Sequence, residues 1–522
     1  MKKSILLAAA ALIAMQAGAQ ETYENARLAN EDLNGTARYV GMGGAMEALG
    51  ADISTMSTNP AGIGMFRHNI VNGTVGLVAQ HDAQSFNSAN KTNVSFDQLG
   101  FVYTMRTGEK SFLNFGFNYH KSKNFDFILS ASDKLSNASQ NKLTYEKYRN
   151  GVFNTTNDVT YNQLDHFYMQ NLLYDKSDNM YYNYPASQYD FDRSHTGYIG
   201  EYDFNISGDI NDRVYLGVTA GIHDVHYKGY SEYFEDLSST SYFSEIGVAD
   251  SRKITGTGFD VKFGVIFRPV ESSPFRIGLY VNTPVWYDLT TSNNTQYYQT
   301  ASASTSSSTL SSAGNSASAG MSESYDFKFY TPWKFGVSLG HTIGNYLALG
   351  ATYEYADYSK CDMRINTGTQ YDWDGYAYDT SSSDDVMNNH ISNTLKGVST
   401  LKLGLEFRPD PAFAVRLGYN YVSPMYNEDG YKDGSLSSPG SYYSSATDYT
   451  NWKATNRITC GMGFKTSGWN FDIAYQYSQT DGDFYPFMSY YNSSNSSENN
   501  ICDAVKVSNK RSQVLLSVGY TF

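Results

Sequence analysis

The chain has 522 residues, and its 38 Lys and Arg against 52 Asp and Glu give a formal net charge of −14. Nucleic-acid binding needs a basic surface, so this balance argues against nucleic acid as a partner. The mean hydropathy of −0.46 excludes a bundle of transmembrane helices. Aromatic residues make up 15% of the chain and charged residues only 17%. Because aromatic side chains favour strands, this composition predicts an all-β protein.

Residues 1–19 have the pattern of a secretory signal peptide. Lys2 and Lys3 precede an apolar run over residues 5–15, and Ala17-Gly18-Ala19 supplies small residues for cleavage. The run is too short to span a bilayer as a helix. We therefore expect the mature chain to begin near Gln20.

Residues 25–66 follow without a regular alternation of apolar and polar side chains. The stretch is rich in glycine, which permits tight turns and close approach of backbone segments. We expect residues 20–68 to form a separate N-terminal unit that precedes the first strand.

From residue 69 onward, apolar and polar side chains alternate. In residues 514–522 the even positions are apolar or aromatic, and the odd positions are mostly small or polar. Successive side chains of a strand point to opposite faces, so this period of two predicts a half-buried strand. Fourteen segments carry the pattern, near residues 69–80, 95–106, 111–122, 196–208, 213–228, 252–270, 275–290, 322–341, 346–359, 394–407, 412–425, 453–464, 469–480 and 509–522.

One face of these segments is continuously apolar, whereas the opposite face is sparse. Phe259, Val261 and Phe263, for example, alternate with Asp260 and Lys262. A soluble sandwich packs large apolar side chains in a dry core, which the small, charged face cannot supply. The pattern therefore predicts a transmembrane antiparallel β-barrel of about 14 strands over residues 69–522, with lipid outside and a polar lumen. Short turns alternate with long loops, which places both chain ends of the barrel on the side of the short turns.

Three of the long connections have a distinct composition. Residues 298–320 are rich in Ser, Ala and Thr, and residues 490–500 in Ser and Asn. Residues 123–195 form the longest connection, with a short helix expected around residues 163–173. Loops of this length are either functional or disordered, so this one is either a folded cap over the pore or a solvated loop.

Charged side chains on the lumen face are candidates for ligand binding. Inward positions of the predicted strands carry Lys262, Arg276, Lys334, Lys402 and Arg416. A buried carboxylate needs a charged donor, so the candidate partners of a ligand carboxylate are Lys262, Arg276, Lys334 and Arg416. The alternative, which we favour, is that these cations pair with inward acidic side chains, namely Asp260, Glu354, Glu406 and Asp472, and hold the lumen together.

No motif indicates catalysis, a cofactor or a metal ion. The segment Gly336-Val337-Ser338-Leu339-Gly340 matches a hydrolase pattern, but that motif needs a strand-to-helix turn and this one lies within a single strand. His223 and His226 point to opposite faces of a strand. The three cysteines, Cys361, Cys460 and Cys502, lack metal-ligand spacing, and a disulfide between Cys361 and Cys502 stays open because both fall in loops. We expect no enzyme activity, no cofactor and no metal ligands.

Several short motifs stand out in the N-terminal unit. The segments Leu33-Asn34-Gly35-Thr36-Ala37-Arg38, 41–45, Ala51-Asp52 and Asn59-Pro60-Ala61 resemble the N-terminal plug of the FadL/TodX/OmpP1 family of outer-membrane transport proteins. Residues 282–286 and 330–336 resemble strand motifs of the same family. The expected plug motif comprises Gly35, Arg38, Gly41, Gly43, Gly44, Asn59, Pro60 and Ala61.

The resemblance implies a function as well as a fold. Residues 20–68 would plug a barrel in the outer membrane of a Gram-negative bacterium. A hydrophobic small molecule, of the long-chain fatty acid or aromatic hydrocarbon type, would be captured by extracellular loops. It would then enter a lumen pocket and leave sideways into the outer-membrane lipid, without ATP. A fatty acid gains about 0.8 kcal/mol per CH₂ on leaving water, and lateral release keeps that gain.

Lateral release requires a break in the hydrogen bonding of the wall. The candidate strand is 111–122, with Gly116 and Asn118 turned inward, because Gly within a strand often marks a bend; an unbroken strand is the alternative. The C-terminal Phe522 is expected to engage the barrel-assembly machinery. The alternative functions are a haemin or other hydrophobic-ligand receptor, a general porin, a surface adhesin barrel, and an esterase with Ser338 as its nucleophile.

Overall fold

The computed structural model describes residues 21–154, 161–238, 243–301, 321–443, 445–492 and 495–522. The predicted signal peptide lies outside these residues, as does most of the Ser-rich stretch 298–320. Within the described ranges, no helix is both long and apolar enough to cross a membrane.

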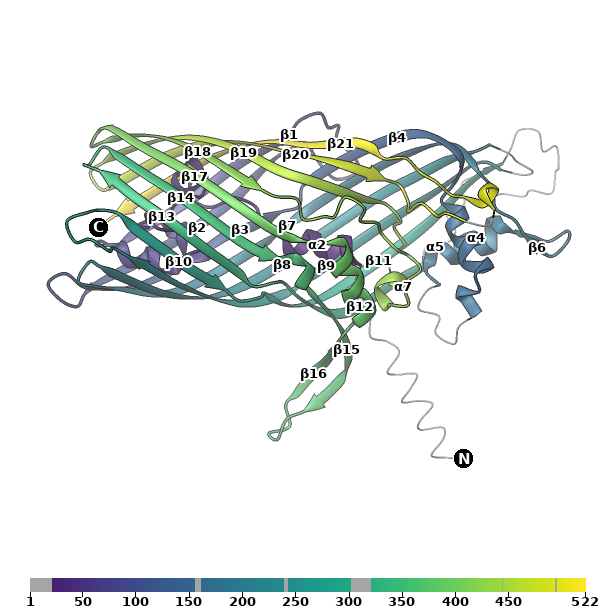
Figure 1. Cartoon of the computed structure of the whole chain (residues 1–522), viewed down its shortest axis with the longest axis horizontal. Helices are drawn as coiled ribbons and strands as arrows, with labels where there is room; N and C mark the ends of the chain where they lie inside the picture. The colour runs from purple at the N-terminus through teal and green to yellow at the C-terminus, as the bar shows by residue number, and fades with distance from the viewer. Residues whose placement is uncertain (1–20, 155–160, 239–242, 302–320, 444, 493–494) are drawn as a thin grey trace.

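The strands form one closed antiparallel barrel (Figure 1). Around the barrel, the order is β1 (Ile70–Gln80), β2 (Thr92–Arg106), β3 (Phe112–Asn124), β7 (Ala186–Ile210), β8 (Val214–Leu237), β9 (Phe243–Phe267), β10 (Arg276–Asn282) with β11 (Trp286–Ala301), β13 (Lys334–Ile343) with β12 (Met321–Tyr330), β14 (Leu347–Asp357), β17 (Gly397–Asp410), β18 (Phe413–Val422), β19 (Tyr449–Thr466), β20 (Trp469–Tyr485) and β21 (Val505–Thr521). Pairing of β21 with β1 closes the ring. The predicted barrel of 14 strands is confirmed.

Two of the predicted strands are each broken in two. Residues 275–290 are interrupted by Thr283-Pro284-Val285, and residues 322–341 by Thr331-Pro332-Trp333. Proline has no backbone N–H to give to a ladder, so each strand breaks there. The neighbouring backbone groups find other partners, since the N–H of Val285 donates to the Thr331 hydroxyl at 2.8 Å and the N–H of Thr331 donates to the Val285 carbonyl at 3.2 Å.

The alternation in the sequence matches the two surfaces of the wall. Phe259 and Phe263 are each 45% exposed, whereas Asp260 and Lys262, between them in the sequence, are only 3% exposed. Large apolar side chains therefore cover the outside of the barrel, and the polar face is turned inward. The predicted orientation of the two faces is confirmed.

Residues 21–66, here called the N-terminal segment, lie inside the barrel (Figure 1). Their helices are α2 (Thr22–Ala29), α3 (Ala37–Gly41) and the 3₁₀ turns η2 (Ile53–Ser57) and η3 (Pro60–Met65). Inward glycines of the wall make room for them: a Cβ at Gly217 would overlap Pro60, and one at Gly418 would overlap Gly43. The N-terminal segment and the wall therefore pack backbone against backbone.

The long loops gather at one end of the barrel, opposite the short turns (Figure 1). Residues 123–195 are largely folded, and the helix expected around residues 163–173 is confirmed. The elements of the loops are β4 (Phe127–Ala138), α4 (Asn141–Arg149), η4 (Val152–Asn154), α5 (Gln163–Tyr168), η6 (Met169–Leu173), β5 (Tyr174–Asp175), β6 (Met180–Tyr181), η7 (Tyr358–Lys360), β15 (Asp362–Tyr371), β16 (Ala377–Ser383), α6 (Asp385–Thr394), α7 (Pro439–Tyr443) and η8 (Ser496–Glu498). The three cysteines are free thiols; Cys361 and Cys502 are buried in separate apolar clusters, so they form no disulfide with each other.

Candidate functional site

A cavity of about 330 Å³ lies inside the barrel, toward the end that carries the long loops. Its lining comes from helix α2, from residues 30–34 of the N-terminal segment, and from the parts of the strands near the long loops. Ligand pockets begin at about 300 Å³, so the cavity has room for a small ligand or part of a longer one.

One side of the cavity is positively charged. Arg457 of β19 and Arg511 of β21 lie on one cross-strand row, because both pair with Ser478 of β20 that stands between them. Arg457 donates to the Asn420 side-chain oxygen at 2.9 Å. Within the described residues, neither arginine has a carboxylate within 4 Å. Three cavity-lining residues thus present two guanidinium groups on either side of a small hydroxyl.

Asp32 of the N-terminal segment faces this charge. Its carboxylate forms an ion pair with Lys123 of β3 at 3.2 Å. Burial alone would raise the pKa of Asp32, but the charges of Lys123, Arg511 and Arg457 outweigh it and lower the pKa below its ordinary value. Asp32 is therefore held as an anion beside three cations.

The cations identified from the sequence contact groups of the protein, and the favoured pairing with inward acids is found for Lys262, Lys402 and Arg416. Lys262 contacts three carboxylates, on Glu201 at 2.7 Å, Asp203 at 3.2 Å and Asp260 at 2.8 Å. The remaining contacts are Lys334 with Glu31, Lys402 with Glu47 at 2.8 Å, Arg416 with Glu406 and Asp472 at 2.6 Å each, and Arg276 with the Leu49 carbonyl at 3.1 Å. Of the five, Lys334 and Lys402 line the cavity. The partners Glu31 and Glu47 belong to the N-terminal segment, which the strand pattern alone could not place.

The residues of the expected plug motif make contacts inside the barrel. Arg38 pairs with Glu406 at 3.0 Å, and the Asn59 side chain donates to the Glu47 carbonyl at 3.0 Å while accepting from the N–H of Ala61. Gly35, Gly43 and Gly44 have positive φ angles of 134°, 65° and 78°, where a side chain would be strained. Gly41 packs against Gly461, and the carbonyl of Pro60 accepts from the Ser207 hydroxyl at 2.7 Å.

The wall of the barrel has a gap beside the cavity. Strand β3 pairs with β2 only from Arg106–Phe112 to Gln98–His120. Beyond this point, in the described part of the chain, residues 92–96 of β2 pair with β1 alone. On the other side, Lys121, Lys123 and Asn124 of β3 pair with β7 alone. We call this opening, between residues 92–97 and residues 121–129, the wall gap.

The N-terminal segment supplies the hydrogen bonds that β2 does not. The N–H of Asp32 donates to the Ser122 carbonyl at 2.8 Å, and the Asp32 carboxylate accepts from the N–H of Asn124 at 3.0 Å. Farther along, the side-chain amide of Gln80 bonds both the N–H and the carbonyl of Ile128, at 2.8 and 2.7 Å. The backbone groups of Ser122, Asn124 and Ile128 are therefore satisfied without a neighbouring strand, as a lipid environment requires.

The cavity reaches the wall gap. Val78 and Asp97 line it from one edge, and Ser122, Phe127 and Leu129 line it from the other. The sequence placed the candidate gate at Gly116 and Asn118, but both residues lie where β3 is fully paired, opposite Val102 and Gly100. Gly116 instead makes room for Met56 of the N-terminal segment, since a Cβ there would overlap the Met56 methyl group.

Comparisons with known proteins give a match in structure but not in sequence. No protein-family model and no curated protein sequence matches the chain. A FadL homologue from Pseudomonas aeruginosa is 11% identical, with a TM-score of 0.50 over 95% of this chain and 100% of its own. The chain has the fold of this FadL homologue. The toluene transporters TbuX of Ralstonia pickettii and TodX of P. putida are 12% and 11% identical, each with a TM-score of 0.49 over 94% of this chain and 99% of their own.

The shared fold does not identify the residues of the site, and the sequence pattern missed several of them. The strand pattern identified inward positions but not their partners, so it missed Arg457 and Arg511, whose signal was only their place on the sparse face. Asp32 had no signal of its own, because its role depends on where the N-terminal segment meets β3.

Proposed function

We propose that the chain is a channel in the outer membrane of a Gram-negative bacterium for the passive uptake of hydrophobic small molecules. The observation that carries this proposal is the contact of an internal cavity with the wall gap. A molecule in the cavity could leave sideways through the gap without crossing water again. The apolar outer surface and the fold shared with a FadL homologue support the same function.

The charge around the cavity favours a ligand with an acidic head group, such as a long-chain fatty acid, over a neutral aromatic hydrocarbon. Arg457 and Arg511 are cationic and without a carboxylate partner among the described residues, so a ligand carboxylate between them would form charge-assisted hydrogen bonds. They replace Lys262, Arg276, Lys334 and Arg416 as our candidates, because Lys262, Lys334 and Arg416 already contact carboxylates of the protein and Arg276 lies outside the cavity lining.

Displacement of Asp32 would open the path. A carboxylate that enters the cavity competes with the Asp32 carboxylate for Lys123, Arg457 and Arg511. When Asp32 moves away, the backbone of β3 at Ser122 and Asn124 loses its partners and the wall gap is free. The N-terminal segment would thus act as a plug that the ligand itself releases.

The C-terminus fits assembly in the outer membrane. Phe522 is 65% exposed at the end of β21, and its ring stacks on Tyr520 with ring centroids 6.0 Å apart. We propose that this exposed aromatic terminus is what the barrel-assembly machinery recognises.

The experiment that tests the function combines native mass spectrometry with transport. We expect the purified barrel to carry fatty acid at about one molecule per chain, and vesicles containing it to take up a fluorescent fatty acid but not sugars. A barrel that passes sugars and binds no lipid would be a general porin. Deletion of residues 20–60 serves as the reference for an open barrel, because it removes the segment that fills the lumen and should let sugars pass.

A further inference from the structure

Six ionisable side chains meet inside the barrel at the base of the wall gap. They are His120 of β3, Glu201 and Asp203 of β7, His223 of β8, and Asp260 and Lys262 of β9, and none is more than 6% exposed. The strand register brings them together, because His120 lies opposite Glu201, and Glu201 lies opposite His223. Gly221 leaves the room that they need, since a Cβ there would lie 2.7 Å from the Lys262 ammonium nitrogen. We call these six residues the His120 cluster.

The charges of the His120 cluster do not balance when the imidazoles are neutral. Lys262 is the ammonium partner of all three carboxylates and contacts Glu201 Oε1, Asp203 Oδ1 and Asp260 Oδ1. Three carboxylates and one ammonium leave a formal charge of −2 in a buried place. Uncompensated buried charge is costly, so such a place favours either two added protons or a divalent cation.

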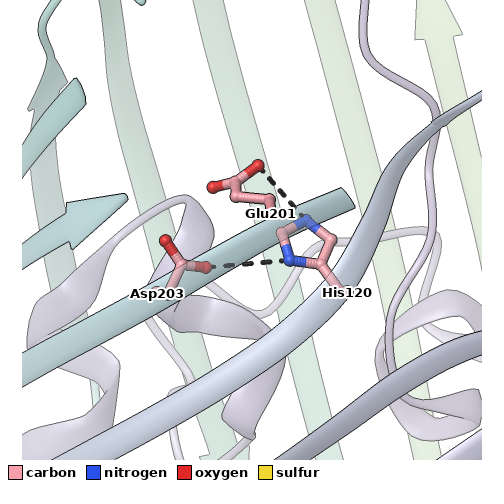
Figure 2. Close-up of side chains that lie close together, drawn as sticks. All are labelled: His120, Glu201 and Asp203. Atoms are coloured by element: carbon pink, nitrogen blue, oxygen red, sulfur yellow. Dashed lines mark ion pairs between the residues drawn. The ribbon is translucent and has the colours of Figure 1, made fainter. Parts of the chain in front are cut away.

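Glu201 and Asp203 each have one carboxylate oxygen that Lys262 does not contact. These two oxygens turn toward the imidazole of His120 (Figure 2). Glu201 Oε2 lies 3.6 Å from His120 Nε2, and Asp203 Oδ2 lies 3.7 Å from His120 Nδ1. These separations are too long for hydrogen bonds. Among the described residues, Asp203 Oδ2 and the two ring nitrogens of His223 are buried and have no hydrogen-bond partner, although His223 Nε2 lies 3.3 Å from Asp260 Oδ1. Buried polar atoms normally have a partner, so these atoms are available to a bound ion.

The spacing suits a metal ion. Ligand atoms of His120, Glu201 and Asp203 lie within 4.8 Å of one another, as do those of Glu201, His223 and Asp260. Around a tetrahedral ion with bonds of about 2.0–2.1 Å, neighbouring ligand atoms are about 3.4 Å apart. An imidazole binds an ion through one nitrogen, and either the 3.6 Å between Glu201 Oε2 and His120 Nε2 or the 3.7 Å between Asp203 Oδ2 and His120 Nδ1 is close to that value. Imidazole with carboxylate is a donor set that Zn²⁺ accepts.

We propose that His120, Glu201 and Asp203 bind a divalent transition-metal ion of the Zn²⁺ type, with His223 and Asp260 as the adjoining donors that share Glu201. The ion can reach the site from the cavity, because His120 lines the cavity beside Asp97 and Ser122. Its charge cancels the formal −2 of the cluster. The proposal does not depend on the transported ligand.

The position of the ion suggests its role. Gln98 and His120 form the last pair of the β2–β3 ladder, and the wall gap begins directly after them. An ion shared by His120 and the two β7 carboxylates would tie β3 to β7 at the base of the gap. It would thereby hold the β3 edge of the wall gap against β7, the neighbour of β3 on the side away from β2.

The test uses the full chain purified in detergent and stripped with a chelator. We expect titration with Zn²⁺ to show one equivalent bound, and Co²⁺ to give the absorption bands of a nitrogen- and oxygen-bound ion. His120→Gln and Asp203→Asn should each weaken binding by at least about 10-fold. His226→Gln is the matched control, because His226 also lies beside an aspartate but is 46% exposed on the outer face, and it should bind as the parent does.

Two results would contradict the metal site. If the parent binds no Zn²⁺ or Co²⁺, or if folded His120→Gln and Asp203→Asn proteins bind as tightly as the parent, the site does not exist and protons neutralise the cluster. If neither variant folds, X-ray absorption of the Zn²⁺-loaded parent decides. A shell that contains imidazole nitrogen together with oxygen supports the site, and a shell without imidazole refutes it.

Discussion

The carboxylate of Asp32 accepts a hydrogen bond from the main-chain N–H of Asn124 at 3.0 Å, at a place where a neighbouring strand would ordinarily supply the acceptor. A residue of the N-terminal segment thus completes the edge of a wall strand. The same residue pairs with Lys123, so one side chain joins the internal segment, the wall gap and the cavity.

The first prediction concerns removal of this charge. Asp32→Asn keeps the shape of the side chain but loses the ion pair with Lys123, and we expect it to lower the free energy of unfolding by about 1–2 kcal/mol. Unfolding in denaturant, followed by gel mobility, measures the change. Asp82→Asn is the matched control, because its ion pair with Lys510 lies on the surface and should contribute less than about 1 kcal/mol. Equal effects of the two substitutions would contradict the role of Asp32.

A second prediction follows from the titration of Asp32. Its pKa in the folded protein is lowered, so its stabilising effect is fully present above the ordinary pKa of the carboxyl group and is lost as the pH falls through the lowered value. The stability difference between the parent and Asp32→Asn should therefore be largest at neutral pH and shrink in acid. Unfolding curves measured from neutral to strongly acidic pH test this, and a difference that grows in acid would show that the sign is wrong.

The third prediction concerns ligand charge. Arg457→Gln and Arg511→Gln should each weaken fatty acid binding about 10-fold, which corresponds to about 1.4 kcal/mol, and leave binding of a neutral aromatic hydrocarbon unchanged. Lys465→Gln serves as control, because Lys465 is an exposed cation at the end of β19. Calorimetry with both ligand types gives the comparison. If the two arginine variants bind fatty acid as the parent does, the carboxylate is recognised elsewhere.

The fourth prediction tests the packing of the N-terminal segment. Gly264→Ala places a methyl group against the Asn59 side chain and 2.9 Å from Cδ of Pro60, so we expect a loss of about 1–3 kcal/mol and faster proteolysis of residues 21–66. Gly73→Ala is the control, because the nearest atom to its added methyl group lies at 3.7 Å. Limited proteolysis of both proteins shows whether the segment is loosened. Unchanged protection in Gly264→Ala would contradict the observed packing.

The barrel could be predicted because its physics is local. Each strand that faces lipid must alternate apolar and polar side chains, so residues such as Phe259, Asp260 and Phe263 reveal both the strand and its two faces. The breaks at Pro284 and Pro332 were not predicted, because the apolar pattern continues past both prolines.

The site depends on register and on contacts far apart in the sequence. His120 and Glu201 are neighbours only because β3 pairs with β7 in one particular register, and a shift of one residue would turn both away from each other. Likewise, no local pattern indicates that Glu47 meets Lys402 or that Asp32 reaches Asn124. For this reason the sequence identified charged lumen residues but assigned the wall gap to the wrong part of β3.

The most direct test of the account is to map the path of a photoreactive fatty acid. The protein in vesicles is irradiated during uptake, and the labelled residues are identified by mass spectrometry. Lateral release predicts label on Val78, Phe127 and Leu129, which line the cavity at the wall gap. Label on Ile63 and Met65, which lie deeper in the barrel on η3, without label at the gap, would show that the molecule travels along the barrel axis and would contradict lateral release.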